Sequence, residues 1–517
     1  MVTEDCRTND SAAERPLSCR WQPAGLTEDC PPQAISGLFP PRSSPPKIAR
    51  IPLSGMRKGV YLKIFQKGDN PLLKRFAANT GWLVAQNVFQ YLLSAVIGII
   101  AARYMGPSNY GILGYGASMM VLFSPLCTLS LNDVLIPAMI DDPDDTGRII
   151  GTAVVMRLVS TTLSILALLG LVAVMKPGNR LMLVVTALQA LQLIVQVCDA
   201  FRLWFQMKLM SKYTAIGSVI GNIACSAWRI WLLIDGASVE WFALTSAIQM
   251  LANYLFVLPM FARFAHVKLG FSTEIVRRLW RRSYQLILAE VTVVVSNRIG
   301  TIFLSNMLGD APLGVYNAAL NIAMMWLFVP QAFVDSATPV LLETNKNNEP
   351  AFWPRYQALF VTVFGICALA GLGLTVLSPL VVDILYGPQY AGSVPLLRVM
   401  AWVGVFSSIG TSRNIWTLAK EKQKYVKYFC FISAAASIAL NYVLIRYMGA
   451  MGAAIGILLV NVIQSLIAPL FWKESREFVV YYLGAAKLVP GLLKRLRQAL
   501  SHGKGPEETE DDSHDDA

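Results

Sequence analysis

Charged residues are scarce in this sequence. Only 15% of its 517 residues are charged and 55% are hydrophobic, with a mean hydropathy of +0.50. A soluble domain carries about 25% charged residues, so this scarcity excludes a soluble globular protein. Instead, apolar runs of the roughly 20 residues that a helix needs to cross a bilayer recur from Trp82 to Trp472. The sequence therefore predicts an all-α polytopic membrane protein.

Histidine and paired cysteines are also rare. The three histidines, His266, His502 and His514, fall outside the expected spans, which excludes a histidine proton relay inside the membrane. The eight cysteines show no CxxC or Cys/His spacing, so neither a metal site nor a disulfide framework is indicated. We expect no metal and no cofactor. No catalytic constellation is visible, and we therefore expect no enzymatic activity.

The few charges are mostly basic, with a net charge of +12 and a pI of about 9.3. In a membrane protein such an excess normally marks cytoplasmic loops, so we expect no nucleic-acid partner. The side of the spans that lacks basic residues has only Arg103, Lys176, Arg180 and Arg446. The other side collects Arg202, Lys208, Lys212, Arg263, Lys268, Arg277, Arg278, Arg281, Arg282, Lys420, Lys422, Lys424 and Lys427. Both termini are therefore expected on the cytoplasmic side.

Twelve spans are expected, six on each side of the longest basic loop. They cover 82–104, 112–139, 149–175, 181–203, 213–235, 239–262, 284–307, 313–340, 356–385, 392–419, 425–447 and 450–472. The chain then divides into a disordered leader at 1–55, which is either native or an over-extended reading frame, and a basic cytoplasmic segment at 56–81. An N-terminal six-helix bundle at 82–262, a basic cytoplasmic linker at 263–283 and a C-terminal six-helix bundle at 284–472 follow. A cytoplasmic amphipathic helix and acidic tail at 473–517 end the chain.

The two sets of spans begin alike. With an offset of 203 residues, GPSNYG at 106–111 aligns with GDAPLG at 309–314, and each segment follows the first span of its half. Glycines around a proline allow the chain to reverse in few residues. The pattern suggests a duplicated six-span unit whose repeats run parallel, as in many transporters.

Several short motifs, in this order and spacing, resemble a known family. They lie at 79–82, 102–107 (ARYMGP), 110–111, 314–319 (GVYNAA), 385–390 (LYGPQY) and 449–454 (GAMGAA). The stretch from about 80 to 472 is similar to the bacterial polysaccharide and oligosaccharide flippases of the multidrug/oligosaccharidyl-lipid/polysaccharide exporter superfamily.

This resemblance implies two six-helix bundles that form a V-shaped transporter with a central cavity in the bacterial inner membrane. The implied cargo is an oligosaccharide linked to a polyprenyl diphosphate, moved from the cytoplasmic to the outer leaflet, with a polysaccharide polymerase and a co-polymerase as candidate partners. One position departs from the family pattern. Its members usually carry an acidic residue in the seventh span ahead of the glycine turn, where this chain has Asn297 and Arg298.

Ionisable residues inside the expected spans are the candidate functional groups. Each costs about 2.5–3.5 kcal/mol at mid-span and is expected to face protein or a water-filled cavity. Arginine binds phosphate oxygens in a bidentate manner and keeps its charge. Alternating access through a cationic cavity would therefore carry a diphosphate head group. The substrate-binding candidates are Arg157, Arg229, Arg298, Arg398 and Arg413, of which Arg157 and Arg298 are the hypothesised head-group contacts.

Other readings of these charges stay open. Arg398 and Arg413 also fit the ends of a span, where a long side chain reaches the interface. Arg229 stands between Trp228 and Trp231, as an interfacial anchor would. Glu290 and Asp335 are candidates either for coupling to H⁺ or Na⁺ or for structural counter-charges.

Three other functions fit this sequence less well than a flippase does. A multidrug/ion antiporter of the same superfamily calls for an acidic chamber, whereas the charges in these spans are mainly arginine. A lipid II flippase typically has fourteen spans, which only a re-entrant segment at 477–493 would supply. A polyprenyl-phosphate glycosyltransferase needs acidic residues in its first outer loop, and 107–111 contains none.

Overall fold

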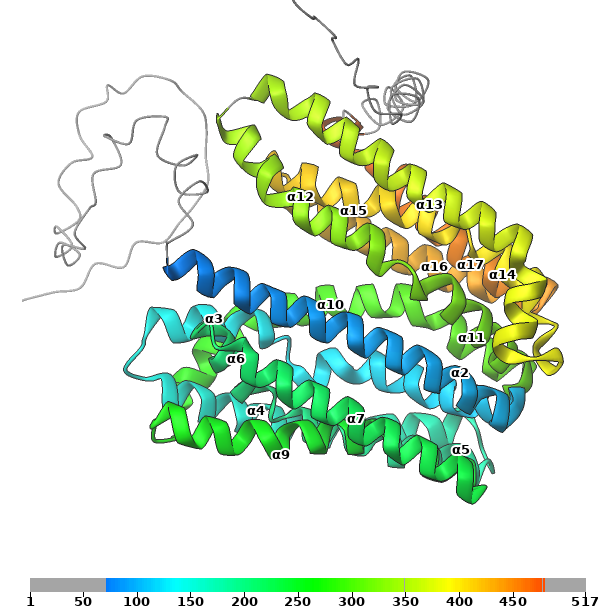
Figure 1. Cartoon of the computed structure of the whole chain (residues 1–517), viewed down its shortest axis with the longest axis horizontal. Helices are drawn as coiled ribbons and strands as arrows, with labels where there is room; N and C mark the ends of the chain where they lie inside the picture. The colour runs from blue at the N-terminus through cyan, green and yellow to red at the C-terminus, as the bar shows by residue number, and fades with distance from the viewer. Residues whose placement is uncertain (1–70, 348, 477, 479–517) are drawn as a thin grey trace, which may run out of the picture. The chain divides into compact units, whose positions relative to one another are not determined.

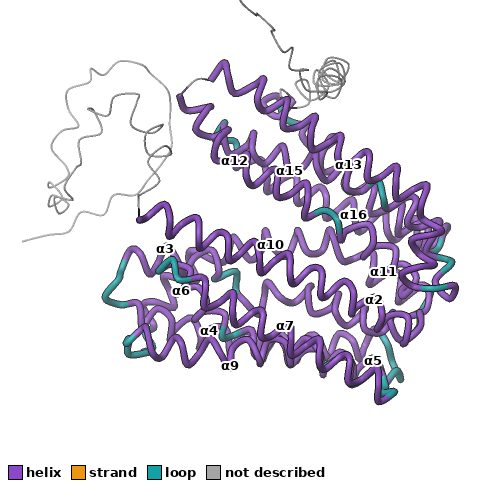
Figure 2. The backbone as a smooth tube through the Cα atoms, in the orientation of Figure 1, coloured by secondary structure: helices purple, strands orange, loops and turns teal. Residues whose placement is uncertain are grey.

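The computed structural model describes residues 71–347, 349–476 and 478, and within these ranges the chain is almost entirely helical with no strand (Figure 2). The expected leader at 1–55, most of the basic segment at 56–81 and all but the start of the segment at 473–517 lie outside the described residues. Helices suit these apolar sequences because each satisfies its own backbone hydrogen bonds inside a bilayer.

The N-terminal half contains α2 to α9 (Figure 1). Its helices are α2 (Pro71–Thr128), α3 (Asn132–Asp141), α4 (Thr146–Met175), α5 (Arg180–Gln196), α6 (Asp199–Met207), α7 (Ser211–Asp235), α8 (Val239–Ala243) and α9 (Thr245–Ala265).

The C-terminal half contains α10 to α17. Its helices are α10 (Thr273–Leu308), α11 (Asp310–Met325), α12 (Phe328–Asn347), α13 (Glu349–Tyr386), α14 (Ser393–Met400), α15 (Val403–Ala419), α16 (Val426–Met448) and α17 (Ala450–Val462). Short 3₁₀ turns cover Pro388–Tyr390, Gln423–Tyr425 and Ala468–Phe471, and a π-helical turn covers Ile463–Ile467.

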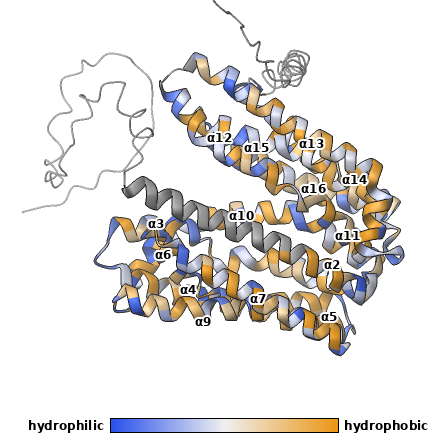
Figure 3. Cartoon of the chain, in the orientation of Figure 1, coloured by the Kyte–Doolittle hydropathy of each residue, from blue (hydrophilic) through white to orange (hydrophobic). Residues whose placement is uncertain are grey.

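Eleven helical stretches of the described chain are long and apolar enough to cross a membrane. The first, Val96–Asp141, contains residues of two expected spans, which are separated inside α2 by the non-helical backbone of Gly106, with φ 72° and ψ 171°. With α2 divided there, the stretches correspond to the twelve expected spans. Figure 3 shows apolar residues along most of the helix lengths.

The two halves are broken in the same places. The second span of each half is split, between α2 and α3 and between α11 and α12, and the fourth is split between α5 and α6 and between α14 and α15. Gly309 also repeats the backbone of Gly106, with φ 92° and ψ −173°. These shared irregularities support the duplicated unit that the sequence suggests.

The turns at the two ends of the helices differ in character. All six described glycines with positive φ lie in turns at one end, which we name the glycine end; they are Gly106, Gly178, Gly236, Gly309, Gly387 and Gly449. The opposite end, which we name the basic end, contains the α6–α7, α9–α10 and α15–α16 connections. Most of the basic residues outside the spans lie there.

At the glycine end the halves meet backbone to backbone. A Cβ atom on Gly111 would lie 1.8 Å from the Asp310 carbonyl oxygen, and one on Gly314 would lie 1.8 Å from that of Pro107. The two contacts are related by the same offset of 203 residues as the sequence repeat. Only glycine, which has no Cβ, permits this approach.

The hydrophobic cores follow the same division. Around the glycine end one core contains residues from both halves, among them Tyr115 and Met119 with Tyr316 and Tyr390. Toward the basic end there are two separate cores, one of N-terminal helices with the start of α10 and one of α12, α13 and α15. Apart from the first part of α10, which packs on the N-terminal core, the halves share a core only at the glycine end.

Helix α10 begins eleven residues before the expected seventh span. Its first turns carry Arg278 and Arg282, which form ion pairs with Asp142 and Asp141 of the α3–α4 segment; the Arg282–Asp141 distance is 3.0 Å. Because these pairs hold the charged turns against the N-terminal half, much of the expected basic linker is helical.

We predict that Gly111→Ala and Gly314→Ala each lower the melting temperature of the detergent-purified protein, because an added methyl forces the two helices apart. Overpacking of this kind costs about 1–3 kcal/mol. Gly170→Ala is the matched control, since Gly170 is helical and no atom lies within 4 Å of its added Cβ. Equal melting temperatures for all three variants would contradict the close contact.

Candidate functional site

Two of the predicted arginines lie in one cavity. Arg229 of α7 and Arg298 of α10 both line a cavity of about 420 Å³, which we name the arginine cavity. Arg229 comes from the N-terminal half and Arg298 from the C-terminal half, and both side chains are half-buried. The other lining residues are Gly98, Ala101, Met105, Tyr110, Leu113, Gly114, Ala117, Ser118, Val121, Gln189, Phe242, Thr245, Ser246, Asn317, Leu320 and Asn321.

No described residue that lines the arginine cavity is acidic. Within the described part of the chain, neither Arg229 nor Arg298 has an ion pair or a side-chain hydrogen bond. Charges in the interior of a membrane protein are normally paired or face a water-filled pathway. Two guanidinium groups without a carboxylate therefore make this cavity suited to an anion.

The tryptophans next to Arg229 make their own contacts, and the Arg229 guanidinium points toward α2. Trp228 and Trp231 contact each other, with ring centroids 5.0 Å apart, and Trp228 Nε1 donates to the Trp241 carbonyl oxygen at 3.2 Å. The Arg229 guanidinium instead reaches toward Gly98 of α2, where a Cβ would lie 4.0 Å from its Nη1 atom.

Arg157 lies elsewhere, inside the N-terminal half. Only 1% of the residue is exposed, and its Nη2 atom donates to Asn132 Oδ1 at 2.9 Å. Its Nε and Nη1 atoms have no partner among the described residues. The structure therefore does not bring Arg157 and Arg298 together in the arginine cavity.

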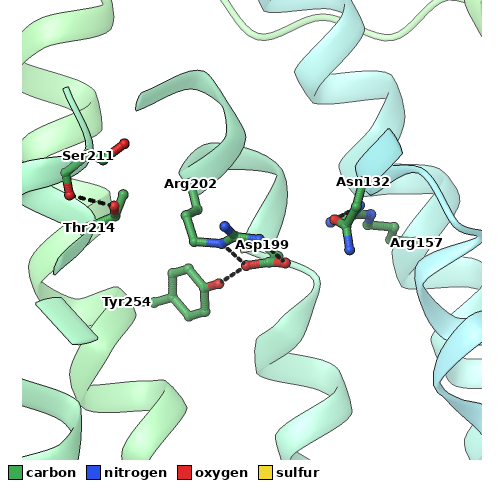
Figure 4. A network of polar contacts seen from close by, with 7 residues as sticks. All are labelled: Asn132, Arg157, Asp199, Arg202, Ser211, Thr214 and Tyr254. Atoms are coloured by element: carbon green, nitrogen blue, oxygen red, sulfur yellow. Dashed lines mark hydrogen bonds and ion pairs between the residues drawn. The ribbon is translucent and has the colours of Figure 1, made fainter. Parts of the chain in front are cut away.

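A neighbouring polar network was not predicted as a site. Arg202 donates to both carboxylate oxygens of Asp199, at 2.6 and 3.0 Å, and the Tyr254 hydroxyl donates to Asp199 Oδ1 at 2.6 Å. Figure 4 shows these three joined, while Arg157 is joined only to Asn132. The available signal was the spacing of Asp199 and Arg202, three residues apart on one helix face.

The network lines a second cavity, of about 360 Å³, with Gln192, Ser218, Gln249, Met250 and Asn253. Its carboxylate already accepts three hydrogen bonds, two of them from a guanidinium. Because Arg202 compensates the charge of Asp199, this cavity offers no free carboxylate to a cation. We interpret the network as a polar contact between α6 and α9 inside the N-terminal half.

The two remaining arginines lie in the C-terminal half, away from the arginine cavity. Arg413 is buried, donates to the Gln464 carbonyl oxygen in the π-helical turn, and stands 4.7 Å from the Phe429 ring centroid. Arg398 is exposed and donates to Ser378 Oγ at 3.2 Å. Both therefore have partners within their own half.

The two candidate acids are exposed and have local partners. Glu290 accepts a hydrogen bond of 2.6 Å from Ser130, which lies at the break between α2 and α3. Asp335 accepts one of 2.7 Å from Gln331, one turn earlier on α12. Neither forms an ion pair with another described residue, and among the described residues no cluster of acidic, histidine and cysteine side chains is able to hold a metal ion.

The family motifs meet where the halves close at the glycine end. The Tyr390 hydroxyl donates to the Ala102 carbonyl oxygen at 2.8 Å, and Gln389 Nε2 donates to that of Arg103 at 2.6 Å. The Tyr110 ring packs edge-on against Tyr390, with centroids 6.2 Å apart. Motifs far apart in the sequence thus form one seam between the halves.

A half-buried ion pair also crosses this seam. Lys176 Nζ lies 3.6 Å from Asp310 Oδ1 and donates to the Ser305 carbonyl oxygen at 2.7 Å. The pair connects the end of α4 to the start of α11, so an ion pair as well as apolar packing joins the two halves at the glycine end.

We predict that Asp199→Asn destabilises the protein, because it leaves Arg202 without its carboxylate. Breaking a buried pair costs about 3–5 kcal/mol, and we expect the lower end because the Arg202 side chain is 37% exposed. The measurement is thermal unfolding of the purified protein, with Asp144→Asn, an exposed residue of the α3–α4 loop, as control. The same melting temperature for both variants would refute a structural role for the pair.

A family model described as "Polysaccharide biosynthesis protein" matches residues 76–345, more than half of the chain. The chain is 25% identical over 214 residues to lipopolysaccharide biosynthesis protein WzxC of Escherichia coli (strain K12), covering 38% of this chain and 42% of that protein. It is 26% identical over 186 residues to a putative O-antigen transporter of Shigella dysenteriae, covering 35% and 46%. Each match spans less than half the length of the relative.

Solved structures show the same fold. A multidrug resistance transporter of the MATE family in an inward-facing conformation superposes with a TM-score of 0.62 at 15% identity, over 78% of this chain and 96% of that one. Lipid II flippase MurJ, in an inward closed conformation, gives 0.57 at 13% identity, over 80% and 92%. These likenesses confirm the expected two-bundle helical fold, and the family match confirms the resemblance: the chain belongs to the polysaccharide biosynthesis protein family.

Proposed function

We propose that this protein flips an oligosaccharide linked to a polyprenyl diphosphate from the cytoplasmic to the outer leaflet of the bacterial inner membrane. The observation that carries the proposal is the pairing of Arg229 and Arg298 in one cavity without a carboxylate. The family and the name of the Shigella relative, a putative O-antigen transporter, support a glycan as the cargo.

The charge of the cavity matches a diphosphate. A guanidinium offers a planar fork of N–H donors that fits two phosphate oxygens at once. In the low-dielectric interior of the bilayer, two such groups compensate much of the charge of the head group. The polyprenyl tail stays in the hydrocarbon, and the sugars follow the head group through the hydrated cavity.

The origin of the two arginines links binding to movement. Because Arg229 belongs to one half and Arg298 to the other, a diphosphate that binds both joins the halves from inside. A change in the angle between the halves then changes the distance between the two guanidinium groups, and with it the affinity for the anion. This is how differential affinity for two conformations drives a population shift.

The state and direction that we propose are supported by the two ends of the helices. The halves share a core at the glycine end, whereas toward the basic end each half has a core of its own, with the first part of α10 packed on the N-terminal one. With the basic end in the cytoplasm, as the distribution of lysine and arginine favours, the cavity receives its cargo from inside.

Glu290 and Asp335 enter this mechanism differently. Glu290 binds Ser130 at the break in the second span, so we assign it the structural role of holding α10 to that break. Asp335 remains the candidate for coupling to H⁺ or Na⁺, because it is exposed and bound only to Gln331 of its own helix. A polymerase and co-polymerase would take up the glycan after release.

We predict that Arg229→Gln and Arg298→Gln each reduce surface polysaccharide at least about tenfold, because each loses a charge-assisted contact worth about 1.5–3 kcal/mol. The measurement is made in cells that lack the chromosomal gene, at equal membrane abundance of each variant. The lipid-linked oligosaccharide should accumulate inside, where its sugar composition also identifies the cargo.

Arg446→Gln is the control, since Arg446 is exposed in the last turn of α16. Arg157→Gln tests the buried arginine of the N-terminal half that does not line the cavity. Normal export by both cavity variants, with loss of export in Arg157→Gln at equal abundance, would overturn the choice of arginines. Accumulation of a cationic drug instead of a glycan would favour a multidrug exporter.

We predict that both termini and the basic end face the cytoplasm. Green fluorescent protein fused to the C-terminus should fluoresce, because it folds in the cytoplasm and not after export through the general secretory route. Alkaline phosphatase inserted at Gly178 should be active, and the same insertion at Leu209 should be inactive. The reverse phosphatase pattern would invert the proposed direction of transport.

A further inference from the structure

The first turns of α10 carry four arginines, and only two of them have partners. Arg278 and Arg282 form ion pairs with the aspartates of the α3–α4 segment. Arg277 and Arg281 are exposed, and neither forms an ion pair or a hydrogen bond with another described residue. Because they stand four residues apart, their side chains project from the same side of the helix, one turn apart.

The two unpaired arginines share a helix face with exposed aromatic and apolar residues. A different face of the same turns, with Ile275, Leu279 and Ile287, is buried in the N-terminal core. The residues of the exposed face, which we name the α10 surface, are Arg277, Trp280, Arg281, Tyr284 and Leu288. At 100° per residue these five positions fall within about 100° of arc. Nearly half of Trp280 and of Tyr284, 49% each, is exposed.

The α10 surface changes character along the helix axis. It begins with arginine, continues with tryptophan and tyrosine, and ends with Leu288, which is 57% exposed. A helix of 36 residues is about 54 Å long, whereas the hydrocarbon core of a bilayer is about 30 Å thick. The first turns therefore extend beyond the hydrocarbon at the basic end. Charged, aromatic and apolar residues in this order are what a helix face presents as it passes from water through the head-group layer into the hydrocarbon.

The chemistry of the α10 surface selects an anionic head group. Two guanidinium groups one turn apart offer several N–H donors to one phosphate, and tryptophan and tyrosine place an apolar body and a polar tip at the head-group level. A zwitterionic lipid carries an ammonium that these arginines would repel. We propose that the α10 surface binds the head group of an anionic phospholipid, such as phosphatidylglycerol, at the basic end.

The α10 surface is separate from the arginine cavity. None of its five residues lines that cavity. Arg281 and Arg298 are 17 residues apart on one helix, which is about 25 Å along the axis, so one diphosphate cannot contact both. The proposal therefore assigns the surface to a membrane phospholipid rather than to the cargo, and it does not rest on the proposed function.

The test measures lipid binding to the purified full-length protein in detergent by native mass spectrometry. The probes are phosphatidylglycerol, phosphatidylcholine and undecaprenyl diphosphate. Wild type should bind phosphatidylglycerol more tightly than phosphatidylcholine. The double variant Arg277→Gln, Arg281→Gln should weaken phosphatidylglycerol about tenfold, because it removes two basic groups at the membrane surface. It should leave phosphatidylcholine and undecaprenyl diphosphate unchanged.

The neighbouring arginines supply a matched control. The double variant Arg278→Gln, Arg282→Gln removes the same charge from the same turns, but from groups that carboxylates already neutralise. It should leave phosphatidylglycerol binding nearly unchanged and lower the melting temperature, because it breaks the ion pairs with the α3–α4 segment. The double variant Arg277→Lys, Arg281→Lys keeps the charge but loses the planar fork, so its affinity should lie between those of wild type and the glutamine variant.

Four results would overturn the proposal. Wild type binds phosphatidylglycerol and phosphatidylcholine equally, or the variant of Arg277 and Arg281 retains the wild-type affinity. Equal weakening by the two glutamine double variants would mean that net charge alone acts. Weakening of undecaprenyl diphosphate as strong as that of phosphatidylglycerol would assign the surface to the cargo. A melting temperature near that of wild type shows that the variant of Arg277 and Arg281 is folded.

Discussion

The backbone contact between Gly111 and Gly314 holds the two halves together, and much of the structure follows from it. Because no side chain separates the second spans there, Pro107 and Asp310 touch the opposite helix with their carbonyl groups. The same approach places Asn317 against Gly114 and brings Tyr110 within a hydrogen bond of Asn321. The arginine cavity lies beside this contact and shares Tyr110, Gly114 and Asn317 with it. A shift of α2 against α11 would therefore move residues that line the cavity.

The distribution of charge partners divides the interior into structural and functional parts. Arg202 and Lys176 bind carboxylates, and Arg413 binds a carbonyl group and an aromatic ring. These contacts offset the cost of placing charge in a bilayer. Arg229 and Arg298 have no such partner among the described residues, and they share a cavity open to one ligand. This unpaired charge in a cavity is what supports the proposed binding site.

Much of the fold was predictable from the sequence, because spans are long apolar runs and the repeat has a fixed offset. The expected twelve spans and two bundles agree with the helices, and the glycine motifs correctly marked the turns. The start of α10 was not predicted, because a run of arginines after an apolar span indicates a loop. In the structure Arg278 and Arg282 form ion pairs with Asp142 and Asp141, which are far away in the sequence. The breaks inside the second and fourth spans were also not predicted.

The sequence by itself determined that this chain is a helical membrane protein of duplicated design, because hydropathy and glycine spacing act locally along the chain. It also marked Arg157, Arg229 and Arg298 as charges inside the expected spans. Only the tertiary structure decided which of them meet, because Arg229 and Arg298 are 69 residues apart in the chain and belong to different halves. Arg157, which the sequence alone could not distinguish from these two, lies inside the N-terminal half and donates to Asn132. Pairing and burial depend on where helices cross, which no local pattern records.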